Sequence, residues 1–283
     1  MGREFSPREL AKERLNAQGR KRRNREVYEE TVARNEAMDF SNKTSRLYSF
    51  RKGAQEEKPE MNVSVVYGDC LDVAWDLAGQ IGTRVGLLNM AHARKPGGGV
   101  KSGCNAQEEA IFRQTTLAHQ LDPKFYPLFD TDASPLDQFR VIFTPSVTIQ
   151  RHGHKEDFRW RTNPREVGVI TAAAEFQPEG GLGASMRCFI EAVLDVAVHE
   201  RITHFVLSAW GSGAYRQDAG LVAGAFREAI LNLRWRNDCS LKKIIFAILN
   251  DHNSQPPGNF QKFEVVMRGI DTYDPNGRGV VMY

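Results

Sequence analysis

The sequence contains no run of 18 or more consecutive apolar residues, so we expect no transmembrane helix and no membrane partner. Cysteine is scarce, with 4 residues in 283, and no Cys-x-x-Cys pair occurs. This spacing excludes a zinc ribbon and a thioredoxin motif, and free thiols in a reducing compartment explain it most simply. An apolar signal core is also missing from the N-terminus. We therefore expect a cytoplasmic protein, or a nuclear one in a eukaryotic cell.

The excess of positive charge belongs to the N-terminal segment. Residues 1–60 contain 15 Lys or Arg and 11 Asp or Glu, whereas the other 223 residues contain 23 and 24. The densest run comprises Arg20, Lys21, Arg22, Arg23 and Arg25. Such a run fits a nucleic-acid patch, a nuclear-import signal or the solvated face of a charged helix. We favour the solvated helix because Glu residues are interleaved, so nucleic acid is not an expected partner.

The residue pattern changes near position 60. Residues 1–60 are polar with weak helical periodicity, and Gly53–Pro59 is typical of a linker. We therefore expect a charged, mainly helical extension over residues 1–60, packed outside the sheet or partly mobile, and one domain over residues 61–283. In that domain expected strands alternate with helices, which indicates an α/β sheet covered on both faces. The expected strands are 63–67, 85–89, 139–148, 166–174, 203–209 and 243–249.

Two glycine-rich loops follow expected strands, at the sheet edge where ligands bind in such folds. The first contains Gly97-Gly98-Gly99, and seven residues later a helix opens with Gln107-Glu108-Glu109. Consecutive glycines let a polar ligand approach the backbone. The paired carboxylates either complement the helix dipole or act on that ligand. The second loop, Ser208 to Arg216, is either a phosphate or diphosphate cradle or a purely structural turn.

These motifs resemble a known family. Gly97 to Gly99 followed by Gln107-Glu108-Glu109 resembles the signature of the poly(ADP-ribose) glycohydrolases, a branch of the macrodomain fold. Trp210 to Tyr215 resembles the diphosphate loop of that family, and Phe246-Ala247-Ile248 resembles its last core strand. The resemblance spans roughly residues 60–270 and fits the microbial, bacterial or fungal type. It implies a macrodomain-like three-layer fold, with a central mixed sheet flanked by helices and an N-terminal helical extension.

The resemblance also implies a reaction, the hydrolysis of ribose–ribose O-glycosidic bonds in poly(ADP-ribose) with release of ADP-ribose. Glu109 is the expected general acid and base, with a pKa raised by desolvation and by the substrate diphosphate. Glu108 and Asn89 would hold ribose hydroxyls. The remaining expected ligand contacts are Asp69 to the adenine amino group, Gly97, Gly98 and Gly99 around the ribose and diphosphate, the N–H groups of Gly211, Ser212 and Gly213 on the diphosphate, Tyr215 at the adenosine end, and Val100, Gln107, Ser208 and Ala214.

Two other functions stay open at this point, hydrolysis of mono-ADP-ribosyl proteins and binding of ADP-ribose without catalysis. The expected partners are poly(ADP-ribose) or ADP-ribosylated proteins, and we expect a monomer without cofactor or metal. Arg216 stands where the family usually has a small residue, which leaves open how far the site reaches beyond one ADP-ribose unit. Because residues 1–60 are expected outside the sheet, deletion of residues 1–40 should leave hydrolysis largely intact.

Overall fold

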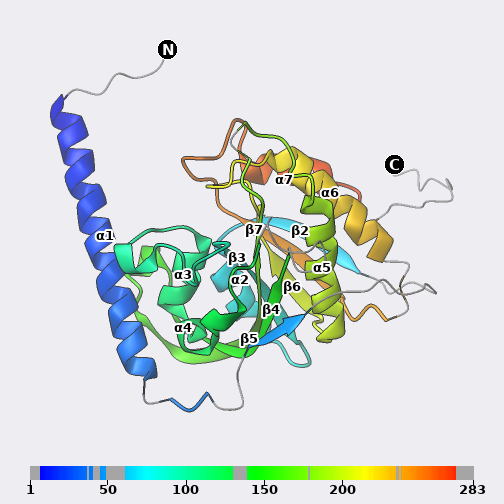
Figure 1. Cartoon of the computed structure of the whole chain (residues 1–283), viewed down its shortest axis with the longest axis horizontal. Coiled ribbons are helices and arrows are strands. Elements are labelled where there is room, and N and C mark those ends of the chain that lie inside the picture. Colours follow the sequence, from blue (N-terminus) through cyan, green and yellow to red (C-terminus); the bar gives the residue numbers. More distant parts are fainter. Residues whose placement is uncertain are drawn as a thin grey trace.

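A seven-stranded mixed sheet forms the centre of the molecule, in the order β1-β4-β5-β3-β6-β7-β2 (Figure 1). The computed structural model describes residues 7–36, 38–40, 45–48, 61–129, 139–177, 179–233, 236 and 238–271. The predicted linker, Gly53–Pro59, lies outside these residues. The parallel strands are β2 (Asn62–Tyr67), β3 (Val85–Ala91), β5 (Trp160–Ala173), β6 (His204–Leu207) and β7 (Lys243–Ile248). Strands β4 (Val141–Arg151) and β1 (Arg46–Tyr48) complete the sheet by antiparallel pairing.

Helices cover both faces of this sheet (Figure 1). Three helices, α2 (Cys70–Ala78), α3 (Gln107–Gln114) and α4 (Leu117–Gln120), contribute to one buried apolar cluster. The opposite cluster contains residues of α5 (Met186–His199), α6 (Ala219–Leu233) and α7 (Asn259–Met267). The predicted three-layer α/β architecture is confirmed. No helix in the described part of the chain is long and apolar enough to span a bilayer.

Strand β5 begins at Trp160, whereas the apolar pattern predicts a start at residue 166. Its first half carries charged residues rather than alternating apolar ones. The Arg161 guanidinium lies 4.5 Å from the ring centre of Trp75, and that of Arg165 lies 3.6 Å from it. Cation–π stacking on α2 therefore replaces apolar burial in this half of the strand.

The parallel arrangement brings the carboxyl ends of several strands to one edge. Asn89 lies near the end of β3, the two glycine loops follow β3 and β6, and Asp69 follows β2. Strand β6 lies next to β3, so the two loops are neighbours in space. The expected site residues therefore come together at one sheet edge, as the general rule for such folds predicts.

The N-terminal helix α1 (Pro7–Asn35) lies against α3 and the 3₁₀ helix η1 (Val100–Ser102) (Figure 1). Val27 and Thr31 are fully buried in this contact. The Thr31 hydroxyl lies 2.6 Å from the Arg113 carbonyl oxygen, within hydrogen-bond distance. The Asn24 side-chain amide donates to the Gly103 carbonyl at 3.2 Å. Helix α1 thus packs outside the sheet, as predicted, but holds the segment that joins the first glycine loop to α3.

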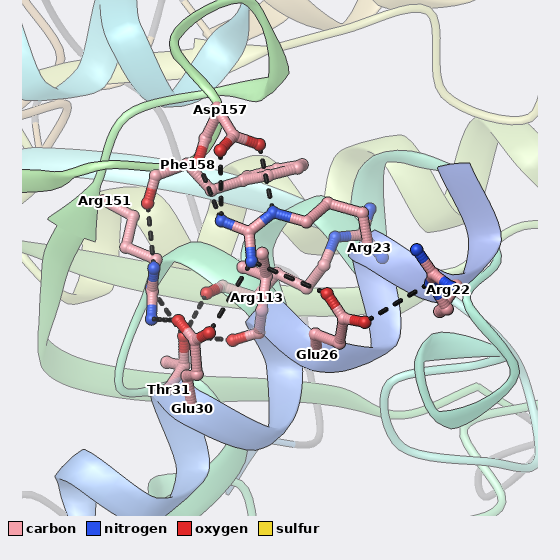
Figure 2. Close-up of polar contacts among 10 residues, drawn as sticks. Arg22, Arg23, Glu26, Glu30, Thr31, Arg113, Arg151, Asp157 and Phe158 are labelled. Atoms are coloured by element: carbon pink, nitrogen blue, oxygen red, sulfur yellow. Dashed lines mark hydrogen bonds and ion pairs between the residues drawn. The ribbon is translucent and has the colours of Figure 1, made fainter. Parts of the chain in front are cut away.

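Charged contacts attach α1 to the β4–β5 hairpin as well (Figure 2). Arg151 is buried and its guanidinium donates to Glu30, to the Thr31 hydroxyl and to the Phe158 carbonyl, each at 2.9 Å. Arg23 pairs with Asp157 at 3.0 Å. Strand β1 also lies before residue 60, yet it belongs to the same sheet. The division of the chain at residue 60 stays a prediction, but these contacts contradict the reasoning behind a harmless deletion of residues 1–40.

Thr31→Val should destabilise the protein by about 1–3 kcal/mol, because it leaves the buried Arg151 Nε and Arg113 carbonyl without their shared hydroxyl partner. Thr31→Ser retains that hydroxyl and serves as the matched control. Urea unfolding at neutral pH measures both variants. A larger loss in Thr31→Ser than in Thr31→Val would mean that methyl packing, rather than hydrogen bonding, holds α1 in place.

Candidate functional site

The Gln107 side chain fixes the start of α3 to the end of β3. Its amide oxygen accepts from the Met90 N–H at 2.9 Å, and its amide nitrogen donates to the Leu88 carbonyl at 2.6 Å. Both bonds go to the backbone of a central strand. Gln107 therefore orients the two carboxylates that follow it in the sequence. Its amide is committed to this internal role, and Val100 is likewise buried in the core.

The two carboxyl groups accept four hydrogen bonds from the backbone. Glu108 accepts from the N–H groups of His92 at 2.8 Å and Gly97 at 3.0 Å. Glu109 accepts from those of Gly99 and Ala106, both at 2.9 Å. The exposed fraction is 3% for Glu108 and 7% for Glu109. Each carboxyl is thus fixed by two N–H donors, and Glu109 is tied to the rim of the loop.

The three glycines are required for packing within the protein itself. A Cβ at Gly97 would meet the Phe112 ring, and one at Gly99 would meet the Cys104 sulfur. Gly98 has a φ of +51°, and a Cβ there would lie 2.6 Å from Glu109 Oε1 and 3.0 Å from Glu108 Oε2. The absence of a side chain at Gly97 and at Gly99 therefore leaves space for neighbouring residues, whereas Gly98 lets the backbone pass directly beside both carboxyls.

Burial raises the pKa of Glu108 from 4.5 to about 8, and the negative charge of Glu109 adds to the effect. The hydrogen bonds from His92 and Gly97 oppose the shift without cancelling it. Near neutral pH Glu108 therefore carries a proton in the free protein. The sequence-based reasoning placed a raised pKa on Glu109 and did not anticipate the raised pKa of Glu108.

Two tyrosines lie beside this pair. The Tyr215 hydroxyl accepts from the Ala93 N–H at 3.3 Å, and its pKa is raised by burial and by the charge of Glu108. Tyr215 was expected at the adenosine end. The hydroxyl contact places Tyr215 close to the loop after β3, because its own loop follows β6, the neighbour of β3. A contact of Tyr215 with the adenosine end stays a prediction.

Tyr126 was not predicted. Its hydroxyl is buried without a hydrogen-bond partner in the described structure, and burial and then the charge of Glu108 raise its pKa. No sequence signal marks it, because it lies in a proline-rich loop far from either motif.

The second glycine loop presents backbone donors. The N–H groups of Gly213, Ala214 and Tyr215 have no acceptor among the described residues. The Ser212 N–H donates instead to the Ala209 carbonyl at 3.0 Å, so its predicted donation to a diphosphate would require that bond to be shared or broken. The Ser212 hydroxyl is buried and has no hydrogen-bond partner among the residues that the structure describes. This loop can still bind an anion, through donors shifted toward Tyr215.

The remaining predicted residues lie along the same edge. Asp69 is half-buried, caps α2 through the Leu71 N–H at 2.8 Å, and has a pKa raised by desolvation. Asn89 is fully buried, and its side-chain oxygen has no partner in the described structure. Ser208 is buried at the start of the second loop, and Gly211, with a φ of +82°, packs near Gln217. The described residues contain no group of three His, Cys, Asp or Glu side chains that could hold a metal.

Comparisons with known proteins give a family match and a similar fold. The family model for the catalytic domain of microbial-type poly(ADP-ribose) glycohydrolase (PARG) matches residues 12–152. A mutant PARG from Thermomonospora curvata has a similar structure, with TM-score 0.66, 22% identity, and coverage of 86% of this chain and 98% of that chain. The PARG from Deinococcus radiodurans in complex with ADP-ribose is also similar, with TM-score 0.61, 23% identity, and coverage of 80% of this chain and 95% of that chain. At these identities the structures show a shared fold. No curated protein matches the sequence.

The family match includes most of α1, Asp69, Asn89, the first glycine loop and both carboxyls, and ends before the second loop. It therefore begins well before residue 60, where the motif resemblance was expected to start. The structure adds the second loop by placing it beside the first. The T. curvata enzyme bound to the inhibitor ADP-HPD also has a similar fold, with TM-score 0.61, 22% identity, and coverage of 85% of this chain and 97% of that chain.

Gly98→Ala should lower the expected hydrolysis by about 10²-fold or more, because its methyl group would displace both carboxyls. Gly82→Ala is the matched control. Gly82 has a φ of +77° and open space around it, so its variant should lose only about 1 kcal/mol of stability and keep full turnover. Initial rates and thermal unfolding separate the two effects. Similar rates for both variants would contradict the proposed contact.

Between about pH 5 and pH 8 the free energy of unfolding should fall as pH rises, by roughly 3–5 kcal/mol from Glu108 alone. The unfolded chain ionises this carboxyl near 4.5, whereas the folded protein keeps its proton up to about 8. The folded state therefore binds more protons in this window. Glu108→Gln should remove this slope in urea unfolding measured at several pH values. An unchanged slope would show that Glu108 is ionised in the fold.

Proposed function

Through residues 12–152 the chain belongs to the microbial-type poly(ADP-ribose) glycohydrolase family, and from this premise we propose that its carboxyl pair cleaves the ribose–ribose bonds of poly(ADP-ribose) and releases ADP-ribose. The observation that carries the proposal is the pair of buried carboxyls, each held by two N–H groups, with Gly98 directly beside them. An arrangement that only bound ADP-ribose would not need a fixed proton donor there.

The sheet edge supports an extended orientation of the ligand. Asp69 follows β2, the second glycine loop follows β6, and the carboxyl pair follows β3. In the order β3-β6-β7-β2 the outer two strands are three spacings, or about 14 Å, apart. That length suits a nucleoside diphosphate sugar. The adenine amino group would lie at Asp69, the diphosphate at the N–H groups near Gly213, and the ribose to be cleaved at Glu109.

The two carboxyls take different roles. A neutral Glu108 can donate its proton to a ribose hydroxyl and adds no negative charge next to the diphosphate. Glu109, bonded to Gly99 and Ala106 at the loop rim, reaches the leaving ribose oxygen. It donates a proton as the C–O bond breaks through an oxocarbenium-like transition state, then accepts one from the water that attacks the anomeric carbon. Glu109 therefore returns to its starting form after the water has attacked, whereas Glu108 keeps its proton throughout.

The two tyrosines support this assignment. The Tyr215 ring lies beside the carboxyl pair and offers a face against which the ribose can pack. The unpartnered Tyr126 hydroxyl is available to a ribose hydroxyl or to Glu108. Asn89 supplies a further unpartnered oxygen close to Glu108. ADP-ribosylated proteins as substrates and a monomeric state remain part of the proposal.

Glu109→Gln should reduce turnover by about 10²–10⁴-fold, because the amide cannot donate and recover a proton. Its affinity for ADP-ribose should change little, because the diphosphate and adenine contacts lie in other loops. Release of ADP-ribose from the polymer gives the rate, and isothermal titration gives the affinity.

Glu108→Gln is the comparison. It should also lose rate, but with weaker ADP-ribose binding and without the alkaline limb in kcat/KM that ionisation near pH 8 gives the native protein. Near-normal turnover of Glu109→Gln would remove this mechanism. Normal ADP-ribose affinity without turnover by the native protein would favour a binding function.

A further inference from the structure

The basic run of α1 is exposed and only partly paired. Arg20, Lys21 and Arg25 are exposed, and no carboxylate pairs with them in the described part of the chain. Arg22 pairs with Glu26 at 3.5 Å on the exposed helix surface. Arg23 points instead toward the hairpin and Asp157 (Figure 2). Three cations on this helix are therefore free to meet an external anion.

These cations lie next to the catalytic loop. A Cβ at Gly103 would overlap the backbone of Lys21, so the two backbones are in direct contact. Gly103 ends η1, which begins directly after Gly99, the donor to Glu109. The same loop exposes three further basic side chains without carboxylate partners in the described structure, so we define the cationic surface as Arg20, Lys21, Arg25, Arg94, Lys95 and Lys101.

The proposed orientation of the substrate directs the rest of the polymer toward this cationic surface. In the proposed orientation ADP-ribose runs from Asp69 to Glu109 along the sheet edge, with the bond to be cleaved at Glu109. The rest of the polymer must leave from that end. Helix α1 lies beside α3 and η1, away from α5, α6 and α7 (Figure 1). The chain beyond the cleaved bond therefore passes the face that carries the cations.

We propose that the cationic surface binds the ADP-ribose units that lie beyond the bond being cleaved, an inference that rests on the proposed function. Each unit carries a diphosphate, so the polymer is a polyanion whose binding releases counterions. The charge is localised, because residues 61–283 have one more acidic than basic residue. Buried Arg151, bonded to Glu30 and Thr31, holds α1 in a fixed position (Figure 2), so the cations are presented at a defined place.

The test compares two triple variants. Arg20→Gln, Lys21→Gln and Arg25→Gln neutralise the α1 part of the surface. Arg201→Gln, Lys242→Gln and Arg268→Gln remove the same charge from exposed positions at the opposite sheet edge, where β6 and β7 begin and α7 ends. KM and kcat are measured on long poly(ADP-ribose) and on an ADP-ribose dimer, at salt concentrations between about 50 and 200 mM.

The dimer has a single unit beyond the cleaved bond, whereas the polymer extends several units along the cationic surface. The α1 variant should therefore raise KM for the long polymer at least about threefold more than KM for the dimer. The slope of log KM against log salt for the polymer should fall by about 2, the share expected for three cations. The control variant should change neither quantity. Equal effects on both chain lengths, or equal effects of both variants, would overturn the proposal.

Competition with single-stranded DNA of matched charge separates the two kinds of polyanion. Weaker competition by DNA than by the polymer supports the proposal, whereas equal or stronger competition would identify a nucleic-acid surface and overturn it. If the native protein releases no ADP-ribose from either substrate, the proposed function fails. The surface is then judged by fluorescence anisotropy of labelled long polymer. Loss of affinity only in the α1 variant would support the surface, and no loss would overturn it.

Discussion

The hydrogen bonds from the first glycine loop to Glu108 and Glu109 determine most of the local structure. They require left-handed backbone at Gly98, a fixed start of α3, and close approach of the loop to both carboxyls. Because the partners are neutral N–H groups rather than cations, they compensate buried negative charge only in part. The protein therefore keeps Glu108 neutral up to about pH 8, and one carboxyl of the pair can stay buried without a counter-ion.

Support for the loop continues outward through α3 to the N-terminal helix. Arg113, one helical turn after Glu109, is buried and donates to the Cys104 carbonyl and the Asn105 side chain, both at 2.6 Å. Burial lowers its pKa to about 10, against the opposing effect of Glu109. Thr31 of α1 in turn meets the Arg113 carbonyl. The sequence predicts a solvated charged helix here, yet the helix is connected to the catalytic loop through successive buried polar contacts.

The sequence predicted the features that depend on local pattern. Strand–glycine–helix order placed both loops at one sheet edge, and Gln107-Glu108-Glu109 marked the carboxyl pair. The proton on Glu108 was not predictable, because its pKa depends on burial by residues distant in sequence. Tyr126 and the attachment of α1 through Thr31 were missed for the same reason, since single long-range contacts leave no periodic signal. The contact of Tyr215 with the loop after β3 was not predictable either, because the strand order, which decides the neighbouring loop, cannot be read from spacing alone.

The distribution of charge addresses a difficulty inherent in this chemistry. A polyanionic substrate has to approach a site whose reacting groups are carboxyls, and ionised carboxyls would repel it. Protonation of Glu108 removes one negative charge inside, where few counter-ions can enter. The exposed cations of α1 and the first loop add attraction outside, where salt screens it within about 10 Å. The contacts that join α1 to Gly103 keep these two regions adjacent, so the helix supports both the geometry and the electrostatics of the site.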